Sequence, residues 1–494
     1  MVRDILWYKL LKLGIRGKII DIIQSMYKNL KSRIKHNNCL SEVFIPTLGV
    51  AQGECISPFL FSMYLNDLEQ EFLLKGYEGV EIGMLKLCLL LYADDVLLFS
   101  ETEQGLQQGF IILQEYCDKW KLTVNTEKTK VMIFKKGGRQ STNIFTFNGK
   151  NIEVVSKFNY LGVVFTCGGA FSETHSALSG QALKAIYKLK SYLNKFTNIT
   201  IKHRLDLFDK MILPILNFGS EVWGFHKETK LEKVHLNFCK QLLGVRQQTQ
   251  NNFIYGELGR VSLKVHRLIA IIRYWLKIVE SPENKYIKHV YLMMLNDIEI
   301  LPNKVSWASN VKSLLESLGL NHAWINQSVG NSKAFLSLCK QRLTDQFVQT
   351  WQAEINDSTR ADSYKLFSDF GFKSYLNVIS ITKFRTDLTR LRISAHRLNI
   401  EMGRWHKPSK IPRNERKCFI CHTLEDEFHF ILECSLYRDQ RKKFINHYYW
   451  RYPNILKFKE LMSTDNQKIL KNLATYVHKC FEIRNRFMYL NDVS

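Results

Sequence analysis

Two adjacent aspartates divide one of the most apolar stretches of the 494-residue chain. Leu87–Ala93 precedes Asp94 and Asp95, and Val96–Phe99 follows them. Each apolar run has the length of one strand, so the stretch predicts two short strands joined by a turn that carries both carboxylates. No apolar run in the chain reaches the ~18 residues that a membrane span requires, and we expect no membrane partner.

The two carboxylates in this turn have two interpretations. Aspartate is common in turns, so the pair could belong to an ordinary surface turn. Like charges this close, however, raise each other's pKa unless a cation compensates them. Divalent cations do so in two-metal phosphoryl transfer, where carboxylates hold Mg²⁺ ions about 3.5–4 Å apart. The turn is therefore a candidate metal site.

The apolar periodicity changes along the chain. Up to about residue 170, helical patterns alternate with short strands, which predicts an α+β domain; beyond it the pattern is helical almost to the end. We expect helices at 4–30 (two, broken at 13–17), 57–74, 102–120, 174–195, 201–217, 227–243 and 261–280, and strands at 131–134, 144–147, 152–155 and 158–165. The expected domains are 1–170, 171–280, 281–382, which has no functional signal, and 383–494.

Four motifs follow one another over about 120 residues: Phe44–Asp67 (FIPTLGVAQGECISPFLFSMYLND), Leu91–Asp95 (LYADD), Trp120–Thr129 and Phe158–Gly162 (FNYLG). In this order they resemble the palm of the reverse transcriptases of non-LTR (LINE-type) retrotransposons, which are RNA-directed DNA polymerases. The resemblance implies an α+β fold with a partial right-hand polymerase palm, ferredoxin-like with an antiparallel sheet and helices. A mostly α-helical thumb and a C-terminal region with a small zinc knuckle would follow it.

The resemblance also implies roles for residues around the acidic turn. Asp94 and Asp95 would be catalytic ligands of the two Mg²⁺ ions, with Asp95 the weaker or supporting one. Gln52, Gly53 and Tyr92 would line the pocket for the template base and the incoming deoxynucleotide. A glycine suits that position because a residue without Cβ lets a base or a backbone approach closely.

The two later motifs carry further implied roles. Lys128 would be the catalytic cation near the departing pyrophosphate. Lys130 remains an alternative, and Lys128 could equally be a solvated lysine at a strand edge. Tyr160, Leu161 and Gly162 would position the 3′ end of the primer, although hydrophobic packing alone would also explain them.

The family's first palm motif carries another catalytic aspartate, just before a segment like Arg3–Leu10. The sequence opens at Met1, and Asp4 lies on the wrong side of that segment. We therefore expect an N-terminally truncated element or a gene-model fragment that lacks the fingers and is inactive as it stands. The alternatives are a noncatalytic nucleic-acid-binding protein derived from such an element, and a group II intron maturase, which explains the knuckle less well.

Cysteine and histidine gather near the end of the chain, in the spacing C-x₂-C-x₇-H-x₄-C. The set is Cys418, Cys421, His429 and Cys434. Three thiolates and one imidazole can close a tetrahedral structural zinc site, so 418–434 predicts a zinc knuckle. The alternatives are coincidence among 11 cysteines, a core histidine at His429, or His422 as the ligand.

The chain is strongly basic, with 70 Lys and Arg against 46 Asp and Glu and a net charge of +24. Such an excess is typical of proteins with a polyanionic partner. Residues 383–417 alone carry 11 Lys and Arg against three acidic residues. A solvated helix face is the alternative to nucleic-acid contact there. The expected contacts are Arg392, Arg397, Arg404, Trp405, Lys407 and Lys410, with Trp405 stacking on a base.

The distribution of cysteines and the family resemblance together predict the compartment and the partners. Cysteines outside the cluster are scattered singly, which favours a reducing, intracellular compartment. The resemblance implies the nucleus and cytoplasm for an active element. It also implies an RNA template, a DNA primer or target and deoxynucleotides as partners, with two Mg²⁺ ions and a structural Zn²⁺ ion as cofactors.

Overall fold

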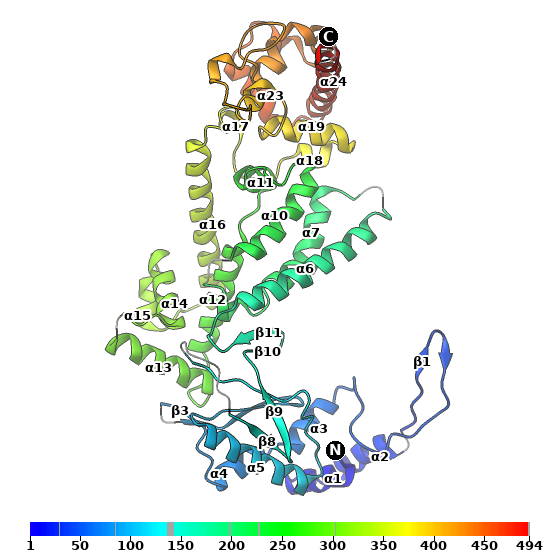
Figure 1. Cartoon of the computed structure of the whole chain (residues 1–494), viewed down its shortest axis with the longest axis vertical. Coiled ribbons are helices and arrows are strands. Elements are labelled where there is room, and N and C mark those ends of the chain that lie inside the picture. The colour runs from blue at the N-terminus through cyan, green and yellow to red at the C-terminus, as the bar shows by residue number, and fades with distance from the viewer. Residues whose placement is uncertain are drawn as a thin grey trace. The chain divides into compact units, whose positions relative to one another are not determined.

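A computed structural model describes residues 1–28, 30–83, 85–135, 143–196, 199–225, 228–301 and 303–492 (Figure 1). The chain divides into two compact units. Unit 1 comprises Met1–Phe171 and Ser281–Lys304, and unit 2 comprises Ser172–Glu280 and Val305–Ser494. Unit 1 mixes helices with strands and unit 2 is helical, so the α+β class that the periodicity predicts is confirmed.

The first half of unit 1 is mainly helical. Its elements are α1 (Arg3–Lys12), α2 (Lys18–Lys28), β1 (Lys35–His36), β2 (Cys39–Leu40), α3 (Ser57–Tyr64) and α4 (Leu68–Leu74). The single helix expected at 57–74 is therefore two helices. The Lys9 ammonium lies at the break, where it donates to the Tyr64 carbonyl at 2.6 Å and to the Asp67 carboxylate at 2.7 Å. These bonds satisfy an end carbonyl of α3 and hold the residue that precedes α4.

The second half of unit 1 contains short strands around one long helix. Its elements are β3 (Val80–Ile82), β4 (Leu85–Leu87), β5 (Leu89–Tyr92), β6 (Asp95–Leu98), α5 (Glu103–Trp120), β7 (Lys130–Val131), β8 (Phe145–Phe147), β9 (Lys150–Val154), β10 (Lys157–Tyr160), β11 (Val163–Thr166) and α13 (Tyr286–Ile300). The described strands form the antiparallel pairs β1–β2, β3–β4, β5–β6 and β10–β11. A three-stranded sheet has β9 parallel to β7 and antiparallel to β8.

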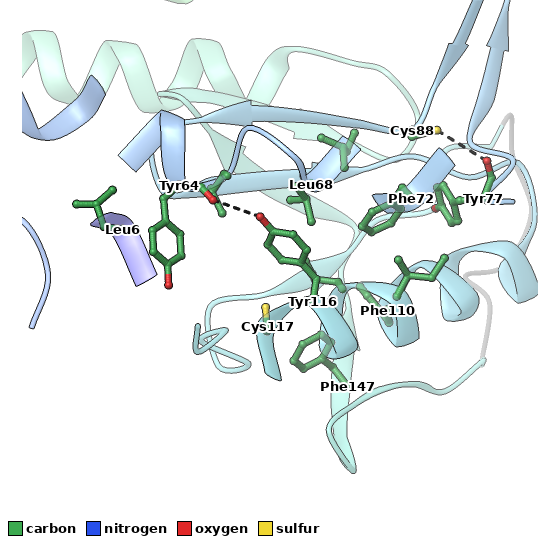
Figure 2. Close-up of a cluster of buried hydrophobic side chains, with 14 of the residues drawn as sticks. Leu6, Tyr64, Leu68, Phe72, Tyr77, Cys88, Phe110, Tyr116, Cys117 and Phe147 are labelled. Carbon is green, nitrogen blue, oxygen red and sulfur yellow. Dashed lines mark hydrogen bonds between the residues drawn. The ribbon is translucent and has the colours of Figure 1, made fainter. Parts of the chain in front are cut away.

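The core of unit 1 forms where α5 meets α4 and the three-stranded sheet (Figure 2). Phe110 and Tyr116 lie on the buried face of α5. The Phe110 ring meets Phe147 edge to face at 6.1 Å, and Phe72 meets Tyr77 in the same way at 5.0 Å. Buried aromatic side chains of this kind each stabilise a core by roughly 1.5–3 kcal/mol.

Unit 2 is built from helices in two stretches of the chain. The first holds α6 (Ser172–Leu193), α7 (Ile201–Met211), α8 (Leu213–Leu216), α9 (Ser220–Trp223), α10 (Thr229–Leu243), α11 (Asn251–Leu258) and α12 (Leu263–Val279). The helix expected at 201–217 breaks before α8, whose first turn contains Pro214. Proline there supplies no backbone N–H, so it favours a new helix start.

The second stretch of unit 2 holds shorter helices around two long ones. They are α14 (Trp307–Ser317), α15 (Asn321–Asn326), α16 (Ser332–Asp357), α17 (Tyr364–Phe367), α18 (Tyr375–Val378), α19 (Thr382–Arg392), α20 (Asn399–Met402), α21 (Arg438–Phe444), α22 (His447–Trp450), α23 (Ile455–Ser463) and α24 (Gln467–Asp492). Among the described helices, none is both long and apolar enough to cross a membrane.

Candidate functional site

The two aspartates lie at the tip of the β5–β6 hairpin. Tyr92 pairs with Asp95 across the strands, so Ala93 and Asp94 form a two-residue turn. Ala93 has a φ of 51°, in the left-handed region that non-glycine residues seldom adopt. This conformation costs roughly 1–2 kcal/mol. Asp94, Asp95 and Tyr92 are all exposed, so the strained turn presents both carboxylates to solvent.

The β10–β11 hairpin carries the last of the four motifs. Its turn residues Leu161 and Gly162 have φ of 49° and 84°, the pattern of a type I′ turn. This turn replaces the single strand expected at 158–165. Burial raises the pKa of Tyr160, and the negative charge of Asp95 raises it further. Tyr160 therefore lies near enough to the acidic hairpin to feel its charge.

The predicted pocket residues Gln52 and Gly53 lie in an exposed loop before α3, where Gly53 has a φ of 91°. The loop is tied to α2 at the next residue, because the Tyr27 hydroxyl donates to the Glu54 carboxylate at 3.0 Å. Among the described residues, no hydrogen bond joins Gln52 or Gly53 to the aspartates.

The two candidate lysines differ in their surroundings. The Lys130 ammonium forms an ion pair with Glu153 at 2.7 Å. Lys128 is exposed in a turn in which its backbone N–H donates to the Asn125 carbonyl at 3.2 Å. Its side chain forms no ion pair with a described residue, so Lys128 is the freer of the two to meet an anionic substrate.

A second potential metal site lies in unit 2. The ligand atoms of Cys418, Cys421, His429 and Cys434 all lie within 4.8 Å of one another, and this is the one group of three or more such ligands in the described part of the chain. The Cys434 sulfur is 3.9 Å from those of Cys418 and Cys421. Zn–S bonds of about 2.3 Å in a tetrahedron place sulfurs about 3.8 Å apart, so the spacing suits zinc.

The histidine in this group has one ring nitrogen engaged and one free. Nδ1 of His429 lies 3.2 Å from the Thr423 hydroxyl and 3.4 Å from the Glu433 carboxylate. Nε2 is buried without a hydrogen-bond partner. Metal-binding histidines typically donate their other N–H to a carboxylate, so this arrangement leaves Nε2 as the ligand atom. The competing His422 is exposed, with a φ of 55°.

The protonation of the group reflects its crowding. Hydrogen bonding from Cys434 lowers the pKa of Cys418 to about 3, and the same bond raises the pKa of Cys434. Burial lowers the pKa of His429, but the Cys418 thiolate outweighs burial and raises it to about 9. A thiolate already favoured without metal is the form that binds zinc.

Buried ion pairs hold this segment in place. The Arg484 guanidinium on α24 donates one hydrogen bond to each carboxylate oxygen of Glu425, both at 2.8 Å. The His396 ring lies 2.9 Å from the Glu427 carboxylate. The sequence analysis missed these supporting residues. The sequence held one local signal of this kind, the i,i+4 spacing that brings Glu433 close to His429. Arg484 and Glu425, and likewise His396 and Glu427, are too far apart in the sequence to be paired from local spacing.

The predicted nucleic-acid contacts fall into three groups. Arg397, Trp405, Lys407 and Lys410 are exposed, with Trp405 67% exposed beneath the Arg360 guanidinium. Arg404 is half-buried and donates to Glu401 at 2.8 Å. Arg392 is buried, with a two-bond ion pair to Glu257 at 3.0 and 3.1 Å, so its guanidinium is already satisfied inside the protein.

Comparison with known proteins matches residues 3–165 to the model of the reverse transcriptase (RNA-dependent DNA polymerase) family. The chain is 23% identical over 231 residues to the RNA-directed DNA polymerase from the mobile element jockey of Drosophila funebris, covering 46% of this chain and 25% of that protein.

Two further relatives agree. The chain is 24% identical over 222 residues to the probable RNA-directed DNA polymerase from transposon BS of Drosophila melanogaster, covering 44% of this chain and 24% of that protein. It is 27% identical over 158 residues to the retrovirus-related Pol polyprotein from the retrotransposable element R2DM, and the match covers 30% of this chain and 15% of that protein. The chain thus spans about a quarter or less of these curated relatives.

Proposed function

We propose that the chain binds an RNA template with a DNA primer and positions a deoxynucleotide at the Asp94–Asp95 hairpin. This hairpin belongs to residues 3–165, a reverse transcriptase domain of the non-LTR retrotransposon type. The observation that carries the proposal is this hairpin, whose strained turn holds two exposed carboxylates.

The carboxylates suit magnesium by their chemistry. Mg²⁺ prefers hard oxygen ligands, keeps several waters and is commonly held by one or two carboxylates together with substrate phosphates. When bound, it compensates the charge that develops on the phosphate oxygens. Asp94 and Asp95 would hold it, while Gln52, Gly53 and Tyr92 would confine the template base and the nucleotide.

The remaining palm residues would act on the two ends of the reaction. The primer 3′ hydroxyl loses its proton to water, its oxygen forms a bond to the α-phosphorus, and the bond from that phosphorus to pyrophosphate breaks. The free ammonium of Lys128 is suited to meet the negative charge of the pyrophosphate as it leaves. The rigid type I′ turn after Tyr160, with Leu161 and Gly162, would hold the primer end in line.

Two features of unit 2 would serve nucleic-acid binding. The Cys₃His group would hold a structural Zn²⁺ ion, with Nε2 of His429 as the fourth ligand. The exposed side chains of Arg397, Trp405, Lys407 and Lys410 would contact phosphates and stack on a base. We leave Arg392 out of this surface because Glu257 already binds it.

We further propose that the 494-residue chain does not polymerise by itself. A two-metal site needs carboxylates that face the pair of ions from opposite sides. Among the described residues, no third carboxylate, histidine or cysteine forms a metal-binding group with Asp94 and Asp95. This observation also favours the second candidate function, a nucleic-acid-binding protein that retains the reverse transcriptase fold without catalysis.

Primer extension tests the first proposal against its alternatives. The purified chain is given oligo(dT) on poly(rA), dTTP and either Mg²⁺ or Mn²⁺. We expect the primer–template to be bound and not extended. Extension abolished by Asp94→Ala would overturn the inactivity and establish a polymerase. Failure to bind the primer–template would overturn the function itself.

A further inference from the structure

Two neighbouring helices near the end of unit 2 carry an excess of cations outside the 383–417 stretch. Helix α21 packs against α24, and the Lys479 ammonium on α24 lies 4.8 Å from the centroid of the Phe444 ring at the end of α21. The Lys443 ammonium lies 5.7 Å from the same centroid, so the two helices bring their charges onto one surface. We call it the α21–α24 surface, and its cations are Arg438, Lys442, Lys443, Lys468, Lys471, Lys479 and Arg486.

The four cations of α24, the long helix near the C-terminus in Figure 1, lie along one face. With 3.6 residues per turn, positions 468, 471, 479 and 486 fall within an arc of about 80°. The buried side chains of Leu473, Val477 and Cys480 point to the opposite side. From the first to the last cation the stripe is about 27 Å long. It therefore spans most of one turn of a double helix, which is about 34–36 Å.

The charges of this surface are not committed within the protein. In the described part of the chain, no carboxylate forms an ion pair with any of the seven cations, of which six are exposed and Lys479 is half-buried. The acidic residues on α21 and on the stripe are Asp439 and Glu482, and Asp387 of α19 lies beside them. Glu482 and Asp387 both contact the His478 ring, at 3.3 and 2.7 Å. Seven free cations against three carboxylates leave a net positive surface.

We propose that the α21–α24 surface binds the phosphate backbone of a nucleic-acid duplex. That the partner is a nucleic acid rests on the proposed function. Single-strand binding combines cations with exposed rings on which unpaired bases stack. The stripe of α24 carries no aromatic residue, and the half-buried Phe444 ring lies beneath two ammonium groups. A duplex needs no such ring, because its bases stack on one another and its phosphates face outward.

An anionic membrane also presents phosphates, but the helix lacks the feature that a membrane surface requires. A helix that lies in a membrane interface buries a free apolar face among the lipids. The apolar face of α24 is already buried inside unit 2, where α19 and α21 pack against the helix. The exposed side offers charge alone, which favours the duplex.

The test is a salt titration of the binding of a fluorescein-labelled 20-base-pair DNA duplex to the full chain. The surface variant is Lys443→Gln, Lys471→Gln, Lys479→Gln. The control variant, Lys277→Gln, Lys333→Gln, Lys340→Gln, removes three exposed lysines from α12 and α16, so both variants lose the same net charge. Each phosphate neutralised on a duplex adds about 0.9 to the salt slope. The surface variant should therefore lose up to about 2.7 from the slope and bind at least about tenfold more weakly at 0.1 M salt.

The control variant should bind the duplex nearly as tightly as wild type. The loss in the surface variant should be larger for the duplex than for a single strand of the same length. Equal losses in the two variants, or a larger loss for the single strand, would overturn the proposal. Binding to phosphatidylserine vesicles that the surface variant loses, with duplex binding unchanged, would assign the surface to a membrane instead. If the wild-type chain binds neither the duplex nor a primer–template, the proposed function fails; if it binds both and the surface variant matches it, this inference alone fails.

Discussion

Asp94 and Asp95 tolerate each other because they are exposed at the tip of a hairpin, where water screens their repulsion. The turn that exposes them depends on Ala93, which carries a left-handed backbone without being glycine. Strain of this kind persists where the surrounding structure fixes it, and it concentrates at functional sites. Burial raises the pKa of Tyr160, and the negative charge of Asp95 adds to this rise, so the charge of the acidic hairpin reaches Tyr160.

At the Cys₃His group, single substitutions should separate ligands from bystanders. Cys421→Ser and His429→Ala should each abolish binding of one Zn²⁺ per chain, because each removes one of four ligands. His422→Ala should leave zinc bound, since that side chain is exposed and outside the group. Metal analysis of the purified full-length proteins measures the content. Zinc-free wild-type protein with a well-ordered 418–434 segment would show the site to be structural without metal.

The ion pair between the buried Lys9 and the half-buried Asp67 predicts a pH-dependent stability of unit 1. Burial raises the pKa of Asp67, but the Lys9 ammonium and the Tyr116 hydroxyl outweigh it, so the pKa lies below its usual 3.8. The contribution is therefore complete above pH 3.8 and is lost as the pH falls through the lowered value. Asp67→Asn should destabilise unit 1 by about 2 kcal/mol at pH 7, because the buried Lys9 ammonium loses its carboxylate partner and keeps only the neutral Tyr64 carbonyl and Tyr116 hydroxyl.

Urea unfolding at pH 7 and pH 3 measures this difference. The gap between wild type and Asp67→Asn should narrow at pH 3, because this pH lies below the usual aspartate pKa of 3.8 and the unfolded wild-type chain already binds a proton at Asp67 there. Asp118→Asn, an exposed change on α5, should match wild type at both values. A gap that stays constant with pH would mean that the charge of Asp67 does not stabilise the fold.

The helices could be predicted where the apolar period alone decides them. The expected 102–120, 174–195 and 227–243 helices are found as α5, α6 and α10, displaced by two residues or fewer at each end. The predictions were wrong where a distant contact or a backbone turn decides the outcome. Lys9 divides the helix expected at 57–74, and the positive φ of Leu161 and Gly162 folds one expected strand into a hairpin.

The candidate sites divide in the same way. The order of the motifs identified the family, and the spacing of 418–434 found four residues that do come together. The burial of Arg392 could not be predicted, because its partner Glu257 is 135 residues away in the sequence. Local charge density gives the composition of a surface, but it does not say which arginines the fold turns inward.

Helix α5 offers a test of packing against intrinsic helix preference. A Cβ on Gly109 would lie 2.7 Å from the Tyr77 ring, whose hydroxyl donates to the Phe99 carbonyl just after β6. Gly109→Ala should therefore destabilise unit 1 by about 1–2 kcal/mol, although alanine favours a helix by about 1 kcal/mol. Gly180→Ala on α6, where a Cβ meets open space, should stabilise unit 2 by up to about 1 kcal/mol. The urea midpoints of the two variants should move in opposite directions. A stabilising Gly109→Ala would show that α5 does not pack closely on Tyr77.

At the scale of the whole molecule, the family match and the basic charge fall on different parts of the chain. The match ends at residue 165, within unit 1, whereas the Cys₃His group and the 383–417 stretch both belong to unit 2. A chain organised in this way would have its nucleotide site in unit 1 and many of its nucleic-acid-binding residues in unit 2. The two functions should therefore be separable by substitutions in one unit at a time.

Template-directed binding of dTTP tests the central claim most directly. The chain is mixed with oligo(dT) on poly(rA) and Mn²⁺, and retention of labelled dTTP is measured by filter binding, with dGTP as the mismatched control. We predict retention of dTTP over dGTP that requires both the template and the metal ion. Asp94→Asn should weaken it at least tenfold while leaving primer–template binding unchanged. Nucleotide binding that ignores the template, or that survives Asp94→Asn undiminished, would contradict a reverse transcriptase nucleotide site at this hairpin.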